Sequence, residues 1–190
     1  MVLFILGLVL FLGVHSVSIW ARPWRDAQVA QRGEGAWKLA YTAVSLVGFA
    51  LLVVGYGHAR LDTLVLWTPP AFMRHLTMLL MLPVFPLLAA SGLPGRIRTV
   101  TKHPMLLAVK IWATAHLLSN GTLVDVVLFA AFLAWAVLDR ISVKRRGVVT
   151  PAAAASPARA DLIAVGVGLV FYVLFVVWGH RWLIGVSPMG

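Results

Sequence analysis

The sequence predicts an all-α membrane protein, a polytopic bundle of about six transmembrane helices with both termini on the outer, periplasmic side. Of the 190 residues, 61% are hydrophobic and 12% are charged, whereas a soluble domain has about 45–50% and roughly 25%. The apolar residues are gathered in runs close to the ~20 residues that cross a bilayer. The formal charge of +10 does not indicate a nucleic-acid partner, because the basic residues cluster in the loops between these runs.

Six apolar runs account for the predicted spans. They lie at residues 2–20, 36–56, 72–90, 104–119, 123–138 and 162–184. The first run is not expected to be a cleavable signal peptide, because it lacks a basic leading region and a small-residue cleavage site. The fourth and fifth runs are short, and the polar residues 119–122 (SNGT) join them as the turn of a helical hairpin.

The basic residues predict the orientation of the spans. Twelve of them lie in or beside the loops that follow spans one, three and five: Arg22, Arg25, Arg32, Lys38, Arg96, Arg98, Lys102, Arg140, Lys144, Arg145, Arg146 and Arg159. The opposite side has only Arg60, Arg74 and Arg181. Because cytoplasmic loops are enriched in Lys and Arg, both termini are expected outside a bacterial inner membrane. Residues 1–190 are predicted to form a single integral-membrane domain, with a flexible, Ala- and Pro-rich cytoplasmic loop near 144–160.

Histidines are the only strong candidate metal ligands inside the predicted spans. Cysteine is absent, which excludes disulfides, thiolate ligands and a cysteine nucleophile. His15 and His116 lie well inside their spans, where a neutral imidazole needs a hydrogen-bond partner or a metal. His58 falls in a loop, and His75, His103 and His180 lie at the ends of spans. A histidine-rich interior without cysteine suits haem, a planar lipophilic cofactor with two axial nitrogens.

Span four has two polar features. His116 shares one stripe with Trp112 at i−4 and Asn120 at i+4. His103 precedes His116 by thirteen positions, which at about 100° and about 1.5 Å per residue puts it on nearly the opposite face and roughly 20 Å away. Lys110 shares the face of His103, and a lysine at that depth needs a buried partner such as a haem propionate or must extend to the surface. Several of the six acidic residues lie near helix ends, where capping or solvation is expected.

The run HPMLLAVKIWATAHLLSNG (residues 103–121), the pair His15-Ser16 and FLAWAVLDRISVKRR (residues 132–146) closely resemble the NnrU family of bacterial membrane proteins. The resemblance covers nearly the whole chain, and its HP…KxWAxAHLLxNG run is specific. It implies an association with denitrification and nitric oxide metabolism, through a biochemical role that the family resemblance does not define.

The HS and HP…W…AH features also resemble, more distantly, the 15-cis-zeta-carotene isomerases. That resemblance implies haem b, held by histidines that match His15 and His116. Lys110, Trp112 and Asn120 are then expected around the cofactor. The isomerases have a cysteine three positions before the second histidine, and Ala113 stands at that position here. A thiolate ligand switch is therefore excluded, and isomerase activity does not follow from the resemblance.

Two other function classes remain open. The pair His103-Pro104 is similar to the start of a helix in isoprenylcysteine carboxyl methyltransferases, which bind S-adenosylmethionine, but Asp139-Arg140 is a poor match to their downstream features. The third class is a non-catalytic membrane assembly or interaction protein. The expected partners are membrane lipid, haem and either a lipophilic substrate or a redox partner, with no nucleic acid.

The pairing of the haem ligands also remains open. The predicted boundaries put His15 in the cytoplasmic half of its span and His116 in the outer half, with an offset of about 13 Å along the bilayer normal. Helix tilt of about 20° absorbs part of this offset. The alternative pairs His15 with His103 or Lys110, and leaves His116 with the secondary candidates His75 or His180.

Overall fold

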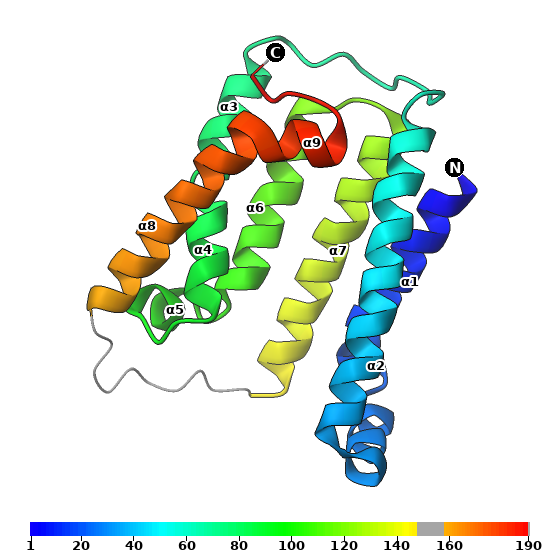
Figure 1. The fold of residues 1–190 in the computed structure, drawn as a ribbon, viewed down its shortest axis with the longest axis vertical. Helices are drawn as coiled ribbons and strands as arrows, with labels where there is room; N and C mark the ends of the chain where they lie inside the picture. Colours follow the sequence, from blue (N-terminus) through cyan, green and yellow to red (C-terminus); the bar gives the residue numbers. More distant parts are fainter. Residues whose placement is uncertain (148–157, 190) are drawn as a thin grey trace. The chain divides into compact units, whose positions relative to one another are not determined.

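A computed structural model of the chain describes residues 1–147 and 158–189. Its contacts divide the chain into two compact units, Met1–Leu64 and Val65–Gly190, which are described separately (Figure 1). Within the described ranges the regular structure is helical, and the single isolated bridge joins Val65 to Thr122. The all-α class is confirmed, and the single membrane domain stays a prediction.

The first unit is a pair of antiparallel helices, α1 (Val2–Trp20) and α2 (Arg22–Ala59) (Figure 1). Glycines bring their main chains together: Gly7 faces the main chain of Leu52, and Gly55 faces that of Phe4. A Cβ atom at either glycine would overlap the opposite backbone. Close packing on small residues is the usual way in which membrane helices associate, because lipid supplies no hydrophobic drive between them.

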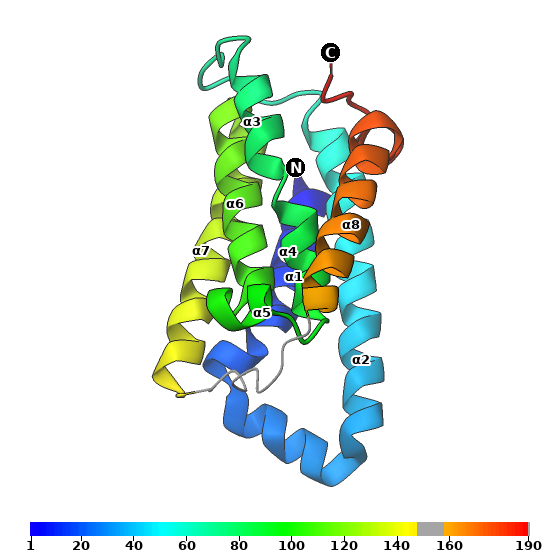
Figure 2. The same ribbon diagram turned by 90° about the vertical axis from the view of Figure 1, so that its left-hand side faces the viewer.

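The helix α2 is broken at Gly33, whose φ of 83° and ψ of 155° lie in a region that is essentially restricted to glycine. Residues 22–32, the crossing segment, lie at an angle to the rest of α2 (Figure 2). The sequence analysis placed these residues in a loop, which is wrong. They are helical because Pro23 occupies the first turn, where it is tolerated, and no other helix breaker precedes Gly33.

The second unit consists of α3 (Met73–Met81), α4 (Val84–Ser91), α5 (Arg96–Thr101), α6 (Pro104–Ser119), α7 (Leu123–Arg145), α8 (Ala158–Leu174), the π-helix η1 (Phe175–Gly179) and α9 (His180–Ile184). The helix α6 packs against α3, α4 and α7, and α8 packs against α4 (Figure 1). Six buried residues form the core between them: Met81, Val84, Leu87, Ala108, Ala115 and Tyr172. This core fixes the face of α6 that carries Ala108 and Ala115.

Pro83 divides the predicted span 72–90 into α3 and α4, because proline has no N–H to donate and clashes with the preceding turn. The N–H of Leu82 turns to the carbonyl of Leu79, at 3.2 Å. The carbonyl of Met78 instead accepts a hydrogen bond of 2.8 Å from the hydroxyl of Tyr172 on α8. The polar group exposed by the break is therefore satisfied inside the bundle, as a low-dielectric interior requires.

The predicted hairpin between spans four and five is confirmed. Thr122 and Asp125 form a capping box at the start of α7, and the carbonyl of Gly121 accepts the N–H of Leu66 at 2.8 Å. The helix α7 continues to Arg145, beyond the predicted end at residue 138, because its polar C-terminal residues extend the helix past the apolar run. The expectation that acidic residues cap helices also holds for Asp161, whose carboxylate accepts the N–H groups of Arg96 and Ile97 at 3.0 Å each.

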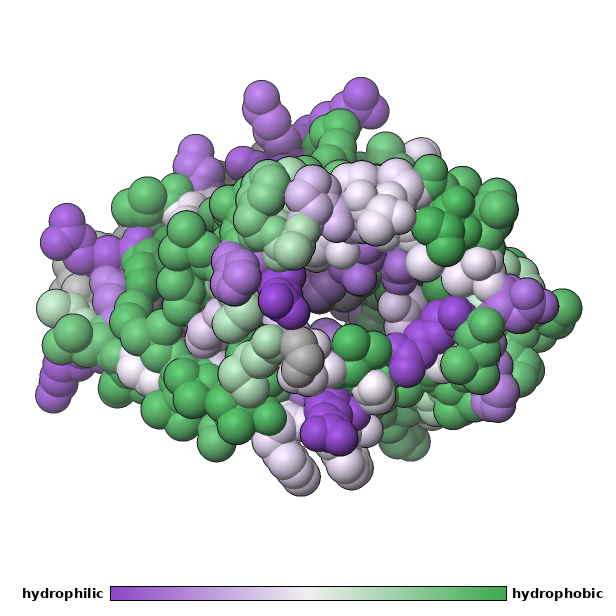
Figure 3. Space-filling model, turned by 90° about the horizontal axis from the view of Figure 1, so that it is seen from above, coloured by the Kyte–Doolittle hydropathy of each residue, from purple (hydrophilic) through white to green (hydrophobic). Residues whose placement is uncertain are grey.

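Five helices in the described ranges are long and apolar enough to cross a membrane: α1, α2, α3–α4 (Met73–Ser91), α7 and α8–α9 (Ala158–Ile184). The helix α6 is apolar but shorter, at 16 residues. Many large apolar side chains are exposed on these helices. Green, hydrophobic surface is also visible in the view from above in Figure 3. The loop predicted near 144–160 stays a prediction, since α7 ends at Arg145 and the described part of α8 begins at Ala158. Its residues 148–157 lie outside the described residues.

Candidate functional site

The imidazole of His116 has a fixed orientation on α6. Its Nδ1 lies 2.8 Å from the carbonyl oxygen of Trp112, one turn earlier. A carbonyl only accepts, so Nδ1 carries the proton and the neutral ring presents Nε2 as its lone-pair donor. Fixing one ring nitrogen on a carbonyl is the usual arrangement for a histidine that ligates a metal through the other.

Aromatic rings surround His116 between α6 and α7. The ring of Phe129 lies 4.7 Å from the imidazole, centroid to centroid, and the indole of Trp112 lies 5.5 Å from it. Trp112 also packs edge-on against Phe129 and Phe132, at 5.1 and 5.3 Å. These contacts make an apolar wall that holds the imidazole and favours its neutral form.

The two other α6 residues predicted near the cofactor differ in their contacts. The side-chain amide of Asn120 donates to the main-chain carbonyl of His116 at 2.8 Å and to the hydroxyl of Ser119 at 3.2 Å. It therefore caps the end of α6, and the bond to the His116 ring comes from Trp112. Lys110 is half-buried and makes no ion pair or hydrogen bond within the described part of the chain. Its ammonium is available to an anionic group.

His15 lies on α1 in a similar setting within the first unit. Its Nδ1 donates to the carbonyl of Phe11 at 2.7 Å, and its ring lies 4.3 Å from that of Phe11 and 5.2 Å from that of Tyr41. It lines a cavity of about 270 Å³ whose other walls are Ser18, Arg25, Trp37, Lys38, Tyr41 and Thr42. An imidazole, aromatic rings and two cationic side chains thus face one space.

The three secondary histidines lie at helix ends. His75 is exposed in the first turn of α3. His103 is the N-cap residue of α6, and burial, followed by the charge of Arg140, holds the pKa of its imidazole below the ordinary value. His180 begins α9, and its Nδ1 donates to the carbonyl of Val186 at 2.7 Å.

His180 directly follows the π-helix η1, a wide turn that often marks a functional position. The ring of Phe175, the first residue of η1, meets the imidazole of His180 edge-on at 5.7 Å. His180 and His116 lie in the same unit, and their pairing, which the sequence analysis left open, stays a prediction. The π-helix itself was missed, since no sequence signal for it is visible.

The preferred ligand pair, His15 and His116, is divided between the two units, and it stays a prediction. Within the described residues, no cluster of three or more His, Asp or Glu side chains is arranged to hold a metal ion. A haem with two axial histidines does not require such a cluster, because the porphyrin supplies the other iron ligands.

The sequence analysis also missed a cavity of about 370 Å³ in the first unit, lined by Trp24, Gln28, Arg32, Ala36, Trp37 and Ala40. A signal for it was present. Trp24, Gln28 and Arg32 are spaced by four residues, which places them on one face of a helix.

Comparison with known proteins identifies one family. The model of the family described as NnrU protein matches residues 3–188, which is nearly the whole chain and includes both units. No match was found among curated proteins or among solved structures, so the second resemblance, to carotene isomerases, is not shown. The chain belongs to the NnrU family.

Proposed function

We propose that this protein binds haem b in the membrane, with His116 as one axial ligand. The observation that carries the proposal is the His116 site: an imidazole anchored through Nδ1 on a main-chain carbonyl and walled by Trp112 and Phe129. The i−4 bond alone does not distinguish it, because the exposed His58 makes the same bond to Val54. The apolar aromatic wall around its ring is what distinguishes His116 from His58.

The residues present fit the chemical needs of haem. Imidazole nitrogens are suitable axial ligands, aromatic side chains suit the faces of a porphyrin, and cations suit its propionates. Lys110 on α6 is a candidate partner for those carboxylates. Arg25 and Lys38 beside His15 are further candidates, which would exchange their surface ion pairs with Asp26 and Glu34 for a propionate. Bound haem would supply iron redox or Lewis-acid chemistry. The chain's own groups would hold it, orient it and exclude water from it.

Two histidines are candidates for the second ligand of the haem iron, and a different observation supports each. The carotene isomerase resemblance favours His15, which lines a cavity. His180 lies in the same unit as His116 and directly follows the π-helix η1, which favours it as the alternative. The NnrU resemblance supports a role for this haem in denitrification or nitric oxide metabolism, through redox or isomerase-type chemistry. We place the protein in a bacterial inner membrane.

Haem content of histidine variants tests the proposal and separates the two pairs. Protein is expressed with added haem precursor, purified in detergent and assayed for haem per chain. His116→Ala is expected to lose most of its haem, whereas His58→Ala, a matched histidine with the same i−4 bond, retains it. Loss in His15→Ala supports the first pair, and loss in His180→Ala supports the second. Full haem content in His116→Ala that elutes as folded protein would overturn the choice of ligand.

A further inference from the structure

The crossing segment, residues 22–32, connects the end of one apolar helix to the start of the apolar part of α2. It therefore lies at a membrane surface, where polar headgroups meet acyl chains. Its basic residues are the ones that the charge rule assigns to the cytoplasmic face. The cavity of about 370 Å³ beside it has a mixed lining, with one guanidinium, one amide, two indoles and two alanines.

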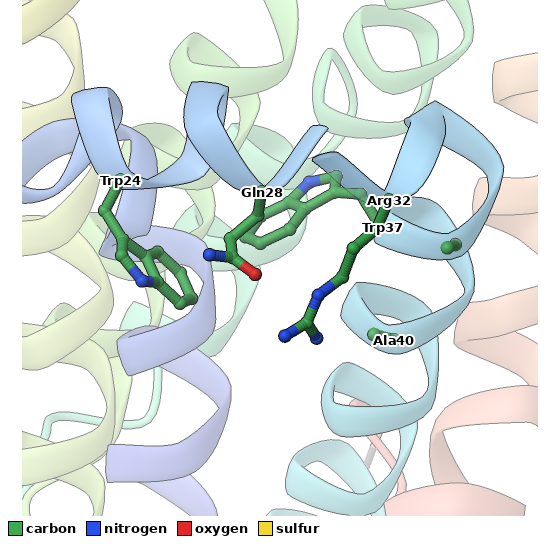
Figure 4. Close-up of a pocket in the computed structure, with 6 residues that line it drawn as sticks. Trp24, Gln28, Arg32, Trp37 and Ala40 are labelled. Atoms are coloured by element: carbon green, nitrogen blue, oxygen red, sulfur yellow. The ribbon is translucent and has the colours of Figure 1, made fainter. Parts of the chain in front are cut away.

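Three of these side chains project from the same side of the crossing segment. Figure 4 shows Trp24, Gln28 and Arg32 reaching from it into a common space, with Trp37 beside them from the next part of α2. The indoles of Trp24 and Trp37 meet edge-on at 5.7 Å. Gly33 produces this arrangement, because the break turns α2 back and brings Trp37 opposite Trp24.

The ion pairs of the segment leave Arg32 available. Asp26 is bound by Arg25 at 2.8 Å and by Arg22 at 3.5 Å, and Glu34 is bound by Lys38 at 2.9 Å. The carboxylate of Asp26 in the segment and that of Glu34 just beyond it therefore each have a cation. Within the described residues, Arg32 and Gln28 have no ion pair or hydrogen bond. Their N–H donors face a cavity whose remaining lining is largely apolar.

We infer that this cavity binds the phosphate of an acidic membrane lipid. A guanidinium donates two parallel hydrogen bonds to a phosphate, and the amide of Gln28 supplies a further donor. The indoles suit the interfacial region, where tryptophan is enriched. Ala36 and Ala40 leave room for the start of an acyl chain along α2. The lipid is expected to fasten the crossing segment to the cytoplasmic leaflet, which is rich in anionic lipid.

The test measures lipid affinity in the full-length protein. Detergent-solubilised protein is titrated with phosphatidylglycerol or with phosphatidylcholine, and bound lipid is counted by native mass spectrometry. Tryptophan quenching by brominated phosphatidylglycerol in vesicles of phosphatidylcholine, at about 0.5 M salt, gives affinities with non-specific surface attraction largely screened. Wild type is expected to prefer phosphatidylglycerol. Arg32→Gln lowers that affinity by about tenfold, the size of one charge-assisted hydrogen-bonded contact.

Arg22→Gln is the matched control, because it removes the same charge from the same helix without touching the cavity. It is expected to change the affinity by less than about twofold at this salt concentration. Arg32→Lys keeps the charge and restores part of the affinity, and Gln28→Leu weakens binding without changing charge. Equal effects of Arg22→Gln and Arg32→Gln, or no preference for phosphatidylglycerol in wild type, would overturn the lipid site. Displacement of the lipid by millimolar inorganic phosphate would overturn it in favour of a free anion.

Discussion

The histidines inside helices form the same local hydrogen bond in this protein. His58, which the sequence analysis placed in a loop, is one of them, because α2 extends to Ala59. His15, His58 and His116 each donate Nδ1 to the carbonyl four residues earlier, at 2.7–2.8 Å. This bond satisfies half of an imidazole wherever it lies, so it explains how a lipid-embedded helix tolerates a histidine. It does not explain the second nitrogen. At His116 the ring lies against those of Trp112 and Phe129, and a metal at its second nitrogen stays a proposal.

Lys110 is the other unusual residue of α6. A lysine deep in a membrane helix costs about 2.5–3.5 kcal/mol on insertion scales, and the described residues give it no partner. Lys110→Met is therefore expected to leave membrane insertion intact while lowering haem content by several fold. The measurement compares membrane yield with haem per chain.

Lys144→Met serves as the control for Lys110→Met, because Lys144 is an exposed lysine near the end of α7. It is expected to leave both quantities unchanged. A Lys110→Met protein with wild-type haem content would show that Lys110 extends to the surface and does not serve the cofactor.

At the scale of the helices, glycine and proline determine where a helix bends or divides, even inside a continuous apolar run. Gly33 bends α2, and Pro83 divides α3 from α4, each inside a segment that forms one candidate span. At Pro83 the exposed carbonyl of Met78 gains the hydroxyl of Tyr172. The breaks therefore come with contacts that compensate for them.

Substitution of Gly33 tests the bend. Gly33→Ala should reduce stability by roughly 1–3 kcal/mol, because its backbone conformation is unfavourable for any residue with a Cβ atom. No neighbouring atom lies within 4 Å of that Cβ, so the effect is conformational. Gly35→Ala is the matched control: its Cβ also meets nothing, and a helical glycine replaced by alanine gains about 0.5–1 kcal/mol. Thermal unfolding in detergent should move the two variants in opposite directions, and equal shifts would contradict the bend.

Tyr172→Phe tests the contact at the Pro83 break. Removal of the hydroxyl leaves the carbonyl of Met78 without its partner from α8, which is expected to cost about 1–3 kcal/mol. Unfolding of the purified variant measures this cost. An unchanged midpoint would mean that the helix itself satisfies the carbonyl.

Local sequence predicted the helices well where strong signals mark their ends. The ends of α1 and α6 agree with prediction, since basic residues with Pro23 follow α1, His103-Pro104 begins α6, and Asn120-Gly121 ends it. The crossing segment was missed because its polar composition is typical of a loop. The spacing of Trp24, Gln28 and Arg32 by four residues is nevertheless that of one helix face. Contacts such as the hydrogen bond from the hydroxyl of Tyr172 to the carbonyl of Met78 depend on packing between distant segments. The periodicity of a single sequence does not predict such contacts.

At the scale of the whole molecule, the basic residues of each unit are concentrated at helix ends. In the second unit, α5 and the last turn of α7 lie at the same end (Figure 1), and both carry basic residues. The helix α6 runs antiparallel to its neighbours α4 and α7, which supports its crossing of the membrane despite its 16 residues.

Topology reporters test the predicted six spans with both termini outside. Fusions after Arg32, Arg98 and Arg146 are expected to report cytoplasm, and fusions after Asp62 and Asn120 are expected to report the periplasm. A cytoplasmic signal after Asn120 would mean that α6 does not cross. It would also place His116 in the other leaflet and overturn the orientation argued from charge.

The central claim is that the bundle holds haem, and a reduced-minus-oxidised absorption spectrum tests it most directly. The full chain is expressed with added haem precursor, purified in detergent and reduced with dithionite. The account predicts a Soret band with sharp bands on reduction, the signature of iron held by two imidazoles. A folded, monodisperse protein without a Soret band would contradict it, and would favour the assembly or interaction role instead.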